Sequence, residues 1–135
     1  MLTSWALISG GSIVKYKGFL ASTGVVTLTS TGSPGTTILS TSVFSNLNTL
    51  RVIVIASVTL NNTGSTVIET VQGFIDNNYV NLAQVTVPAG DYVQAEVVYS
   101  FTVTPGGHTV GIAAYGGTVQ AVYAQMLLLS VENTQ

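Results

Sequence analysis

Residues 50–60 read LRVIVIASVTL, and this stretch decides the fold class. Every even-numbered residue in it is apolar, which predicts a strand with one face fully buried in a core. The odd-numbered residues are mixed, so the other face is only partly apolar, as in a central strand of a sandwich. They are Arg51, Ile53, Ile55, Ser57 and Thr59.

Further strands are predicted on both sides of this one, because runs rich in Val and Thr alternate with Gly, Pro and Asn turn signals. Residues 118–131 are ambiguous, since they contain good helix formers, but Val119 and Val122 favour a strand. The spacing predicts an all-β, antiparallel two-sheet β-sandwich of about 8–9 strands. Besides residues 50–60, the expected strands are residues 13–20, 25–31, 36–44, 65–75, 79–87, 91–104, 108–115 and 118–131.

The length of 135 residues suits a single domain. We expect residues 13–135 to form it. Residues 1–12 are predicted to be an N-terminal arm or a first edge strand, because the segment contains Gly10-Gly11 and the single Trp5.

Charge is unusually scarce in this chain. Charged residues make up 6% of it, against roughly 25% in an ordinary soluble domain. Three Lys and Arg residues are too few for a nucleic-acid surface, and the absence of cysteine excludes disulfides and thiolate metal sites. Unbroken apolar stretches such as residues 52–56 are too short to span a bilayer, so we expect no membrane insertion.

No catalytic motif is present in the sequence. The single histidine, His108, follows a Pro-Gly-Gly turn, and the spacing of the carboxylates pairs none of them. There is no Gly-x-Ser-x-Gly elbow and no phosphate-binding loop. We therefore expect no enzyme, no cofactor and no metal site.

Two groups of residues are candidates for contacts with other molecules. The turn with Asp76, Asn77, Asn78 and Tyr79 combines oxygen ligands with an aromatic ring, which makes it the best candidate ligand loop. A calcium site there is a weaker alternative, because the Asp-x-Asp-x-Asp-Gly pattern is missing. Tyr115 and Tyr123 flank the Gly116-Gly117 turn and are candidate subunit contacts, since tyrosine tolerates a half-wet interface.

The chain also has more apolar strand surface than one sandwich core needs. Residues 50–60 and 126–131 are expected to bury one face of their strand in the core, yet their other face is apolar as well. That second face includes Ile53, Ile55, Leu127 and Leu129. A two-layer sandwich normally leaves the outer face of each sheet polar. A second copy of the chain would cover such a face, so we predict a homo-oligomer with these four residues at its interface.

Four pieces of sequence carry a resemblance to a known family. They are the strand of residues 50–60, Val85-Thr86-Val87-Pro88-Ala89-Gly90, Tyr99-Ser100-Phe101-Thr102-Val103-Thr104-Pro105-Gly106-Gly107-His108-Thr109-Val110 and Gln125-Met126-Leu127-Leu128-Leu129-Ser130-Val131. Together they resemble the tumour-necrosis-factor-like jelly roll, especially the viral and phage versions in spikes and fibre heads. The resemblance covers roughly residues 36–132 and implies a jelly roll that forms a homotrimer, with no catalytic residue to carry over.

The resulting expectation is a non-enzymatic structural or appendage protein of a virion, with a virion or extracellular location. Its partners would be its own copies, other virion proteins or a host surface receptor. One alternative is a receptor- or glycan-binding head module. Another is a subunit of an extracellular cellular filament, joined by strand exchange through residues 1–11. Assembly through apolar faces with so few charges would also suit acidic or hot surroundings.

Overall fold

The structure is a computed structural model that describes residues 4–8, 12–22, 24–45 and 50–133. Ten strands lie within these residues, and no helix long and apolar enough to cross a membrane occurs among them. The strands are β1 (Ser4–Ile8), β2 (Ser12–Ser22), β3 (Val26–Leu28), β4 (Thr36–Ser45), β5 (Leu50–Asn61), β6 (Val67–Ile75), β7 (Asn78–Val87), β8 (Tyr92–Val103), β9 (Gly106–Tyr115) and β10 (Val119–Asn133).

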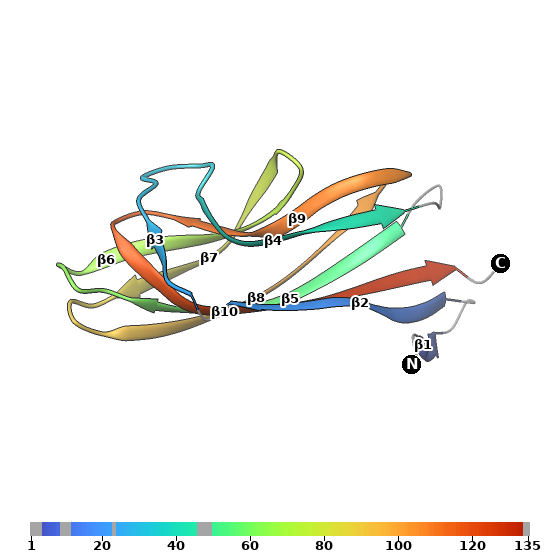
Figure 1. The fold of residues 1–135 in the computed structure, drawn as a ribbon, viewed down its shortest axis with the longest axis horizontal. Coiled ribbons are helices and arrows are strands. Elements are labelled where there is room, and N and C mark those ends of the chain that lie inside the picture. Colours follow the sequence, from blue (N-terminus) through green and yellow to red (C-terminus); the bar gives the residue numbers. More distant parts are fainter. Residues whose placement is uncertain (1–3, 9–11, 23, 46–49, 134–135) are drawn as a thin grey trace.

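The strands form two antiparallel sheets stacked face to face (Figure 1). Sheet A has the order β1-β2-β10-β5-β8, with β3 also paired to β10, and sheet B has the order β4-β9-β6-β7. Without the short strands β1 and β3, consecutive strands mostly alternate between the sheets, which is the double Greek key of a jelly roll. The predicted fold class is therefore confirmed.

The two short strands extend sheet A at its edge. β1 pairs with β2 of the same chain, and β3 pairs with β10 over three residues only, so it is shorter than the predicted strand of residues 25–31. β10 confirms that the C-terminal stretch is a strand and not a helix. The division into residues 1–12 and 13–135 stays a prediction.

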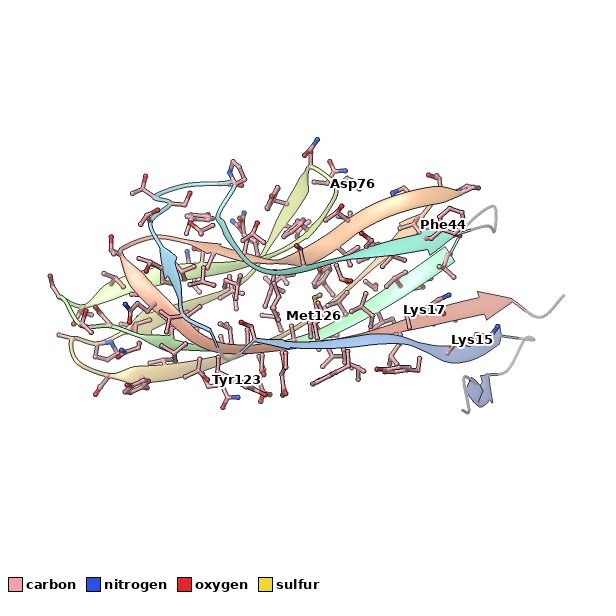
Figure 2. The ribbon with its side chains drawn as sticks, viewed as in Figure 1. Lys15, Lys17, Phe44, Asp76, Tyr123 and Met126 are labelled. Carbon is pink, nitrogen blue, oxygen red and sulfur yellow. The ribbon has the colours of Figure 1, made fainter. Side chains whose placement is uncertain are left out.

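The core lies between the two sheets and is made by the residues that the alternation of residues 50–60 predicts. All even-numbered residues of that stretch are buried, whereas Ile55 is 42% exposed. Met126 of β10 points into the same interior (Figure 2). Its other main members are Leu28, Leu128, Val71, Val87, Val110 and Ile112.

The sheets approach closely where β8 crosses sheet B. The Tyr99 ring lies directly over Gly73, where an added Cβ would come within 2.6 Å of the ring. The Tyr99 hydroxyl donates a hydrogen bond of 2.6 Å to the carbonyl of Gly111, and burial raises the pKa of Tyr99 to about 12. This contact joins β8 of sheet A to β6 and β9 of sheet B.

Candidate functional site

A row of apolar side chains crosses the outer face of sheet A, the face that points away from the core. Leu127 of β10 lies opposite Phe19 of β2 and opposite Ile55 of β5, and Ile55 lies opposite Val98 of β8. The row therefore spans four adjacent strands. Phe19, Ile55 and Val98 are all exposed, at 52%, 42% and 64%.

A second apolar pair lies beside this row. Leu129 of β10 is opposite Ile53 of β5, and both are half-buried. We call Phe19, Ile53, Ile55, Val98, Leu127 and Leu129 the apolar face. The structure thus brings together four of the six residues predicted for subunit contacts and adds Phe19 and Val98, which sequence reasoning missed.

The apolar face is hollowed and bordered by polar residues. A hollow of about 290 Å³ lies over it, lined among others by Phe19, Val98 and Leu127. Further along the same strands the outer face becomes polar, where Gln125, Ser57 and Glu96 lie in one row. The apolar face therefore ends at a polar row.

The two tyrosines predicted as subunit contacts lie on different sheets. Tyr123 projects from the outer face of sheet A (Figure 2) and is 38% exposed. Tyr115 belongs to sheet B, where its hydroxyl accepts a hydrogen bond of 3.2 Å from the side-chain amide of Asn81. A flat contact on sheet A would include Tyr123 but not Tyr115. Their role in subunit contacts stays a prediction.

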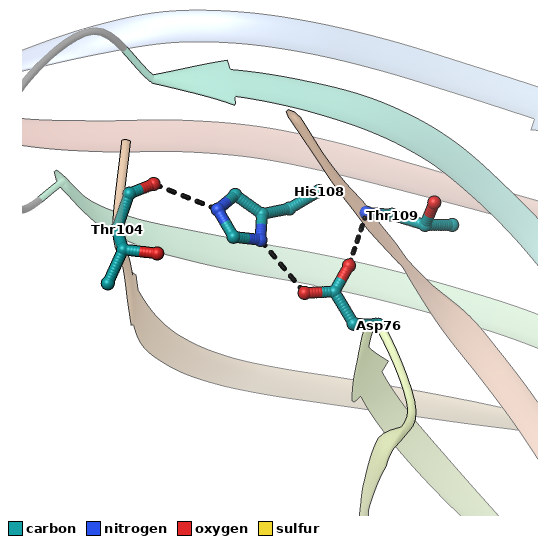
Figure 3. Close-up of polar contacts among 4 residues, drawn as sticks. All are labelled: Asp76, Thr104, His108 and Thr109. Atoms are coloured by element: carbon teal, nitrogen blue, oxygen red, sulfur yellow. Dashed lines mark hydrogen bonds and ion pairs between the residues drawn. The ribbon is translucent and has the colours of Figure 1, made fainter. Parts of the chain in front are cut away.

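Asp76, the first residue of the candidate ligand loop, is held by its own neighbours (Figure 3). It has a φ of 51°, and its carboxylate accepts hydrogen bonds from the His108 ring at 2.8 Å and from the Thr109 amide at 3.0 Å. The other His108 ring nitrogen donates to the carbonyl of Thr104 at 2.8 Å. Sequence reasoning missed this contact, because Asp76 and His108 lie 32 residues apart.

Both acceptors of His108 favour its charged form. The carboxylate and the carbonyl can be satisfied together only when both ring nitrogens carry a proton. The bond to Asp76, and then the bond to Thr104, raise the pKa of His108. The bonds from His108 and Thr109 lower the pKa of Asp76. The Asp76–His108 pair therefore ties the β6–β7 turn to β9, and the bond to Thr104 ties β9 to the end of β8.

The rest of the candidate ligand loop lines an open hollow on sheet B. Asn77, Asn78 and Tyr79 face Ser33 and Pro34 across about 680 Å³. The Tyr79 ring stacks on Phe74, with ring centres 4.8 Å apart and planes inclined by 26°. Within the described residues, no three His, Cys, Asp or Glu side chains gather to form a metal site.

One buried carboxyl group lies inside sheet B. Glu69 of β6 is fully buried, and neither of its oxygens has a hydrogen-bond partner. Its desolvation raises the pKa of Glu69 to about 7, and the nearby Gly117 amide opposes this shift less strongly. This raised pKa makes the stability of the fold depend on pH.

Comparison with known proteins gives similarity of fold only. No family model matches the chain, and no curated protein matches it. The Eiger TNF structure from S. frugiperda is 9% identical, with a TM-score of 0.45 over 82% of this chain and 92% of that one. The CBM22-1 xylan-binding domain from Paenibacillus barcinonensis Xyn10C is 15% identical, with a TM-score of 0.41 over 87% of this chain and 86% of that one.

Proposed function

We propose that this protein is a non-enzymatic structural subunit that assembles with copies of itself through the apolar face of sheet A. The observation that carries the proposal is the continuous row of Phe19, Leu127, Ile55 and Val98 across four strands. These side chains point away from the core, and no part of the described chain covers them. Burying them between copies would remove apolar surface from water.

The size of the apolar face fits a contact between subunits. Four strands about 4.8 Å apart and two rows about 6.7 Å apart give an area of roughly 260 Å². A patch of that size is not unusual on a monomer, and its distinguishing property is its continuity across four strands. A typical stable interface buries about 800 Å² on each partner, so the polar rows beside the face would supply the remaining area.

The charges around the apolar face favour a second copy as its partner. Arg51 lies at one end of β5, and Glu96 lies on β8 opposite Ser57, near the other end. A contact between neighbouring copies could therefore pair the arginine of one copy with the glutamate of the next. The formal net charge of the chain is only −2, so the chain has no strong electrostatic field that would attract a highly charged partner.

We place this assembly on a virion or in the extracellular space, as a spike, fibre head or coat component, with a trimer favoured. The sequence resemblance to viral and phage jelly rolls supports this setting, and the jelly-roll fold agrees with it. The alternative of a filament joined by strand exchange would require β1 to leave β2, with which it pairs in the same chain.

Light scattering on the purified chain, with one matched pair of variants, tests the assembly. We expect about three chain masses of 14.0 kDa for the unmodified protein and one chain mass for Ile55→Glu, because a buried unpaired carboxylate opposes association. The control is Ile68→Glu, since Ile68 is equally apolar, 59% exposed and on sheet B. Circular dichroism confirms that both variants fold.

Three results would contradict the proposal. In the first, the unmodified protein is a single chain at every concentration. In the second, Ile55→Glu and Ile68→Glu have the same mass in solution. The third result is a long polymer that survives Ile55→Glu but is lost when residues 1–11 are deleted, which would favour the filament.

A further inference from the structure

We infer that the outer face of sheet B binds a neutral oligosaccharide, in the hollow between the loop before β4 and the β6–β7 hairpin. These two segments rise from the same side of the molecule (Figure 1). Residues from both line the hollow of about 680 Å³, a size within the range of small-molecule sites. This surface lies on the sheet opposite the apolar face, so the inference is independent of the proposed assembly.

One buried side chain ties the loop before β4, which forms one wall of the hollow, to β6 and β7. Gln72 of β6 is 1% exposed. Its side-chain oxygen accepts a hydrogen bond of 2.9 Å from the Gly35 amide, and its side-chain nitrogen donates to Ser33 at 3.0 Å. The same nitrogen donates to Asn81 at 2.9 Å. The hollow is therefore pre-formed, which lowers the entropic cost of binding.

Small residues on β9 make room for this arrangement. Ala113 lies opposite Gln72, and Gly111 lies opposite Phe74. A Cβ at Gly111 would come within 2.7 Å of the Phe74 ring and 2.2 Å of the carbonyl of Leu39. The glycine thus lets Phe74 lie close to the sheet, and Phe74 in turn supports the ring of Tyr79.

The groups that line the hollow match the hydroxyl groups of a sugar. Asn77, Asn78 and Ser33 each offer both a donor and an acceptor, as a sugar hydroxyl does. Tyr79 offers an aromatic face of partial negative charge to the C–H side of a sugar ring. Its stacking on Phe74 fixes the orientation of that face before any ligand binds.

The ligand should be uncharged. None of the six residues that line the hollow carries a charge. Asp76 is adjacent, but its carboxylate is bonded to His108 and to the Thr109 amide. Lys15, Lys17 and Arg51 lie on β2 and β5 of sheet A, so they cannot neutralise an anion bound on sheet B. His108 lies on sheet B, but its ring is already bonded to the Asp76 carboxylate.

The site is long enough for several sugar units. A second hollow, of about 320 Å³, continues along β7 and is lined by Thr70, Asn81 and Gln84 among others. From Tyr79 to Gln84 the strand extends about 17 Å. Asn81 of the second hollow directly follows Val80 of the first, and its amide donates to the Tyr115 hydroxyl. We therefore expect an oligosaccharide to bind better than a single sugar.

Calorimetric titration with a defined set of sugars tests the inference. The neutral probes are cellohexaose, mannohexaose and maltohexaose, and the charged probes are 3′-sialyllactose and a heparin hexasaccharide. We expect saturable binding of at least one neutral probe, weakened about tenfold or more by Tyr79→Ala. The matched control is Tyr92→Ala, because Tyr92 is an exposed tyrosine at the start of β8 in sheet A.

A second variant keeps the test informative if Tyr79→Ala does not fold. Asn78 is exposed at the start of β7, so Asn78→Ala should fold and should weaken binding of the same probe. Ile55→Glu should bind it unchanged, which separates failure of this site from failure of the assembly. The inference is overturned if no neutral probe binds at about 1 mM, if only charged probes bind, or if Tyr92→Ala weakens binding as much as Tyr79→Ala.

Discussion

β5 and β6 are central strands of the two sheets, and they differ in the kinds of side chain that they bury and expose. β5 is apolar on its inner face and largely apolar on half of its outer face. β6 is buried on both faces, yet it contains Glu69, Thr70 and Gln72 among its buried residues. The two sheets of one jelly roll therefore have different outer chemistry.

This difference has a physical consequence for each sheet. An apolar side chain in water costs modest free energy and can be covered later by a partner. A buried polar group must find hydrogen bonds within the fold, as Gln72 does, or lose its charge, as Glu69 tends to do. A change of pH should therefore affect stability through sheet B, whereas self-association should depend on the outer face of sheet A.

The largest expected effect compares two adjacent leucines of β10. Leu128 is 2% exposed in the core, so Leu128→Ala should lower the free energy of unfolding by about 2–5 kcal/mol. Leu127 faces outward, so Leu127→Ala should lower it by less than about 1 kcal/mol in a monomer. Urea unfolding in the Ile55→Glu background measures both values. Equal losses of unfolding free energy in the two variants would show that Leu127 contributes to stability as a core residue does.

The next effect concerns the buried carboxyl group of sheet B. Its pKa is about 7 in the folded state against 4.5 ordinarily, so its contribution to stability is fully present below pH 4.5. That contribution is lost as the pH rises through about 7, and the free energy of unfolding should fall by about 3 kcal/mol. Glu69→Gln should remove this pH dependence, as measured by urea unfolding at several pH values.

The control for this prediction is Asp91→Asn, which changes an exposed carboxyl group between β7 and β8 and should leave the pH dependence in place. The mass of the assembled protein should stay constant from about pH 4.5 to pH 7, because the apolar face contains no titrating group. A pH dependence that survives Glu69→Gln would mean that another group causes it.

The smallest effect should come from the surface pair at the β6–β7 turn. Asp76→Asn removes the carboxylate that raises the pKa of His108, so that pKa should fall toward its ordinary value. Stability from this raised pKa is present below pH 6.5 and is lost as the pH rises through the folded-state value. NMR titration of the imidazole measures the pKa. Asp91→Asn, in another turn, is the control, and an unchanged midpoint in Asp76→Asn would contradict the assignment.

Local patterns were enough to predict the strands and the inner face of sheet A. Strict alternation over residues 50–60 decides which side chains enter the core, because successive strand residues point to opposite faces. The same rule placed Ile53, Ile55, Leu127 and Leu129 on the outer face. It missed Phe19 and Val98, because their partners across β2, β10, β5 and β8 depend on strand order.

The candidate binding hollow depended on contacts between distant residues. Gln72 joins Ser33 and Gly35, which lie 39 and 37 residues away, and no local pattern predicts such a pairing. The bulge in β10 beside Val122, where the register shifts between Ala121 and Tyr123, also has no clear sequence signal. The sequence therefore predicted the candidate ligand loop at Asp76–Tyr79, but not that Ser33 and Pro34 would lie across the hollow from it.

By itself, the sequence determined an all-β sandwich with a surplus of apolar surface and almost no charge, because these properties follow from composition and from a period of two residues. Only the tertiary structure decided that the surplus forms one row on sheet A and that the polar groups of sheet B surround a hollow. Both results depend on which strands become neighbours, and that order is set by packing of the whole chain and not by any single strand.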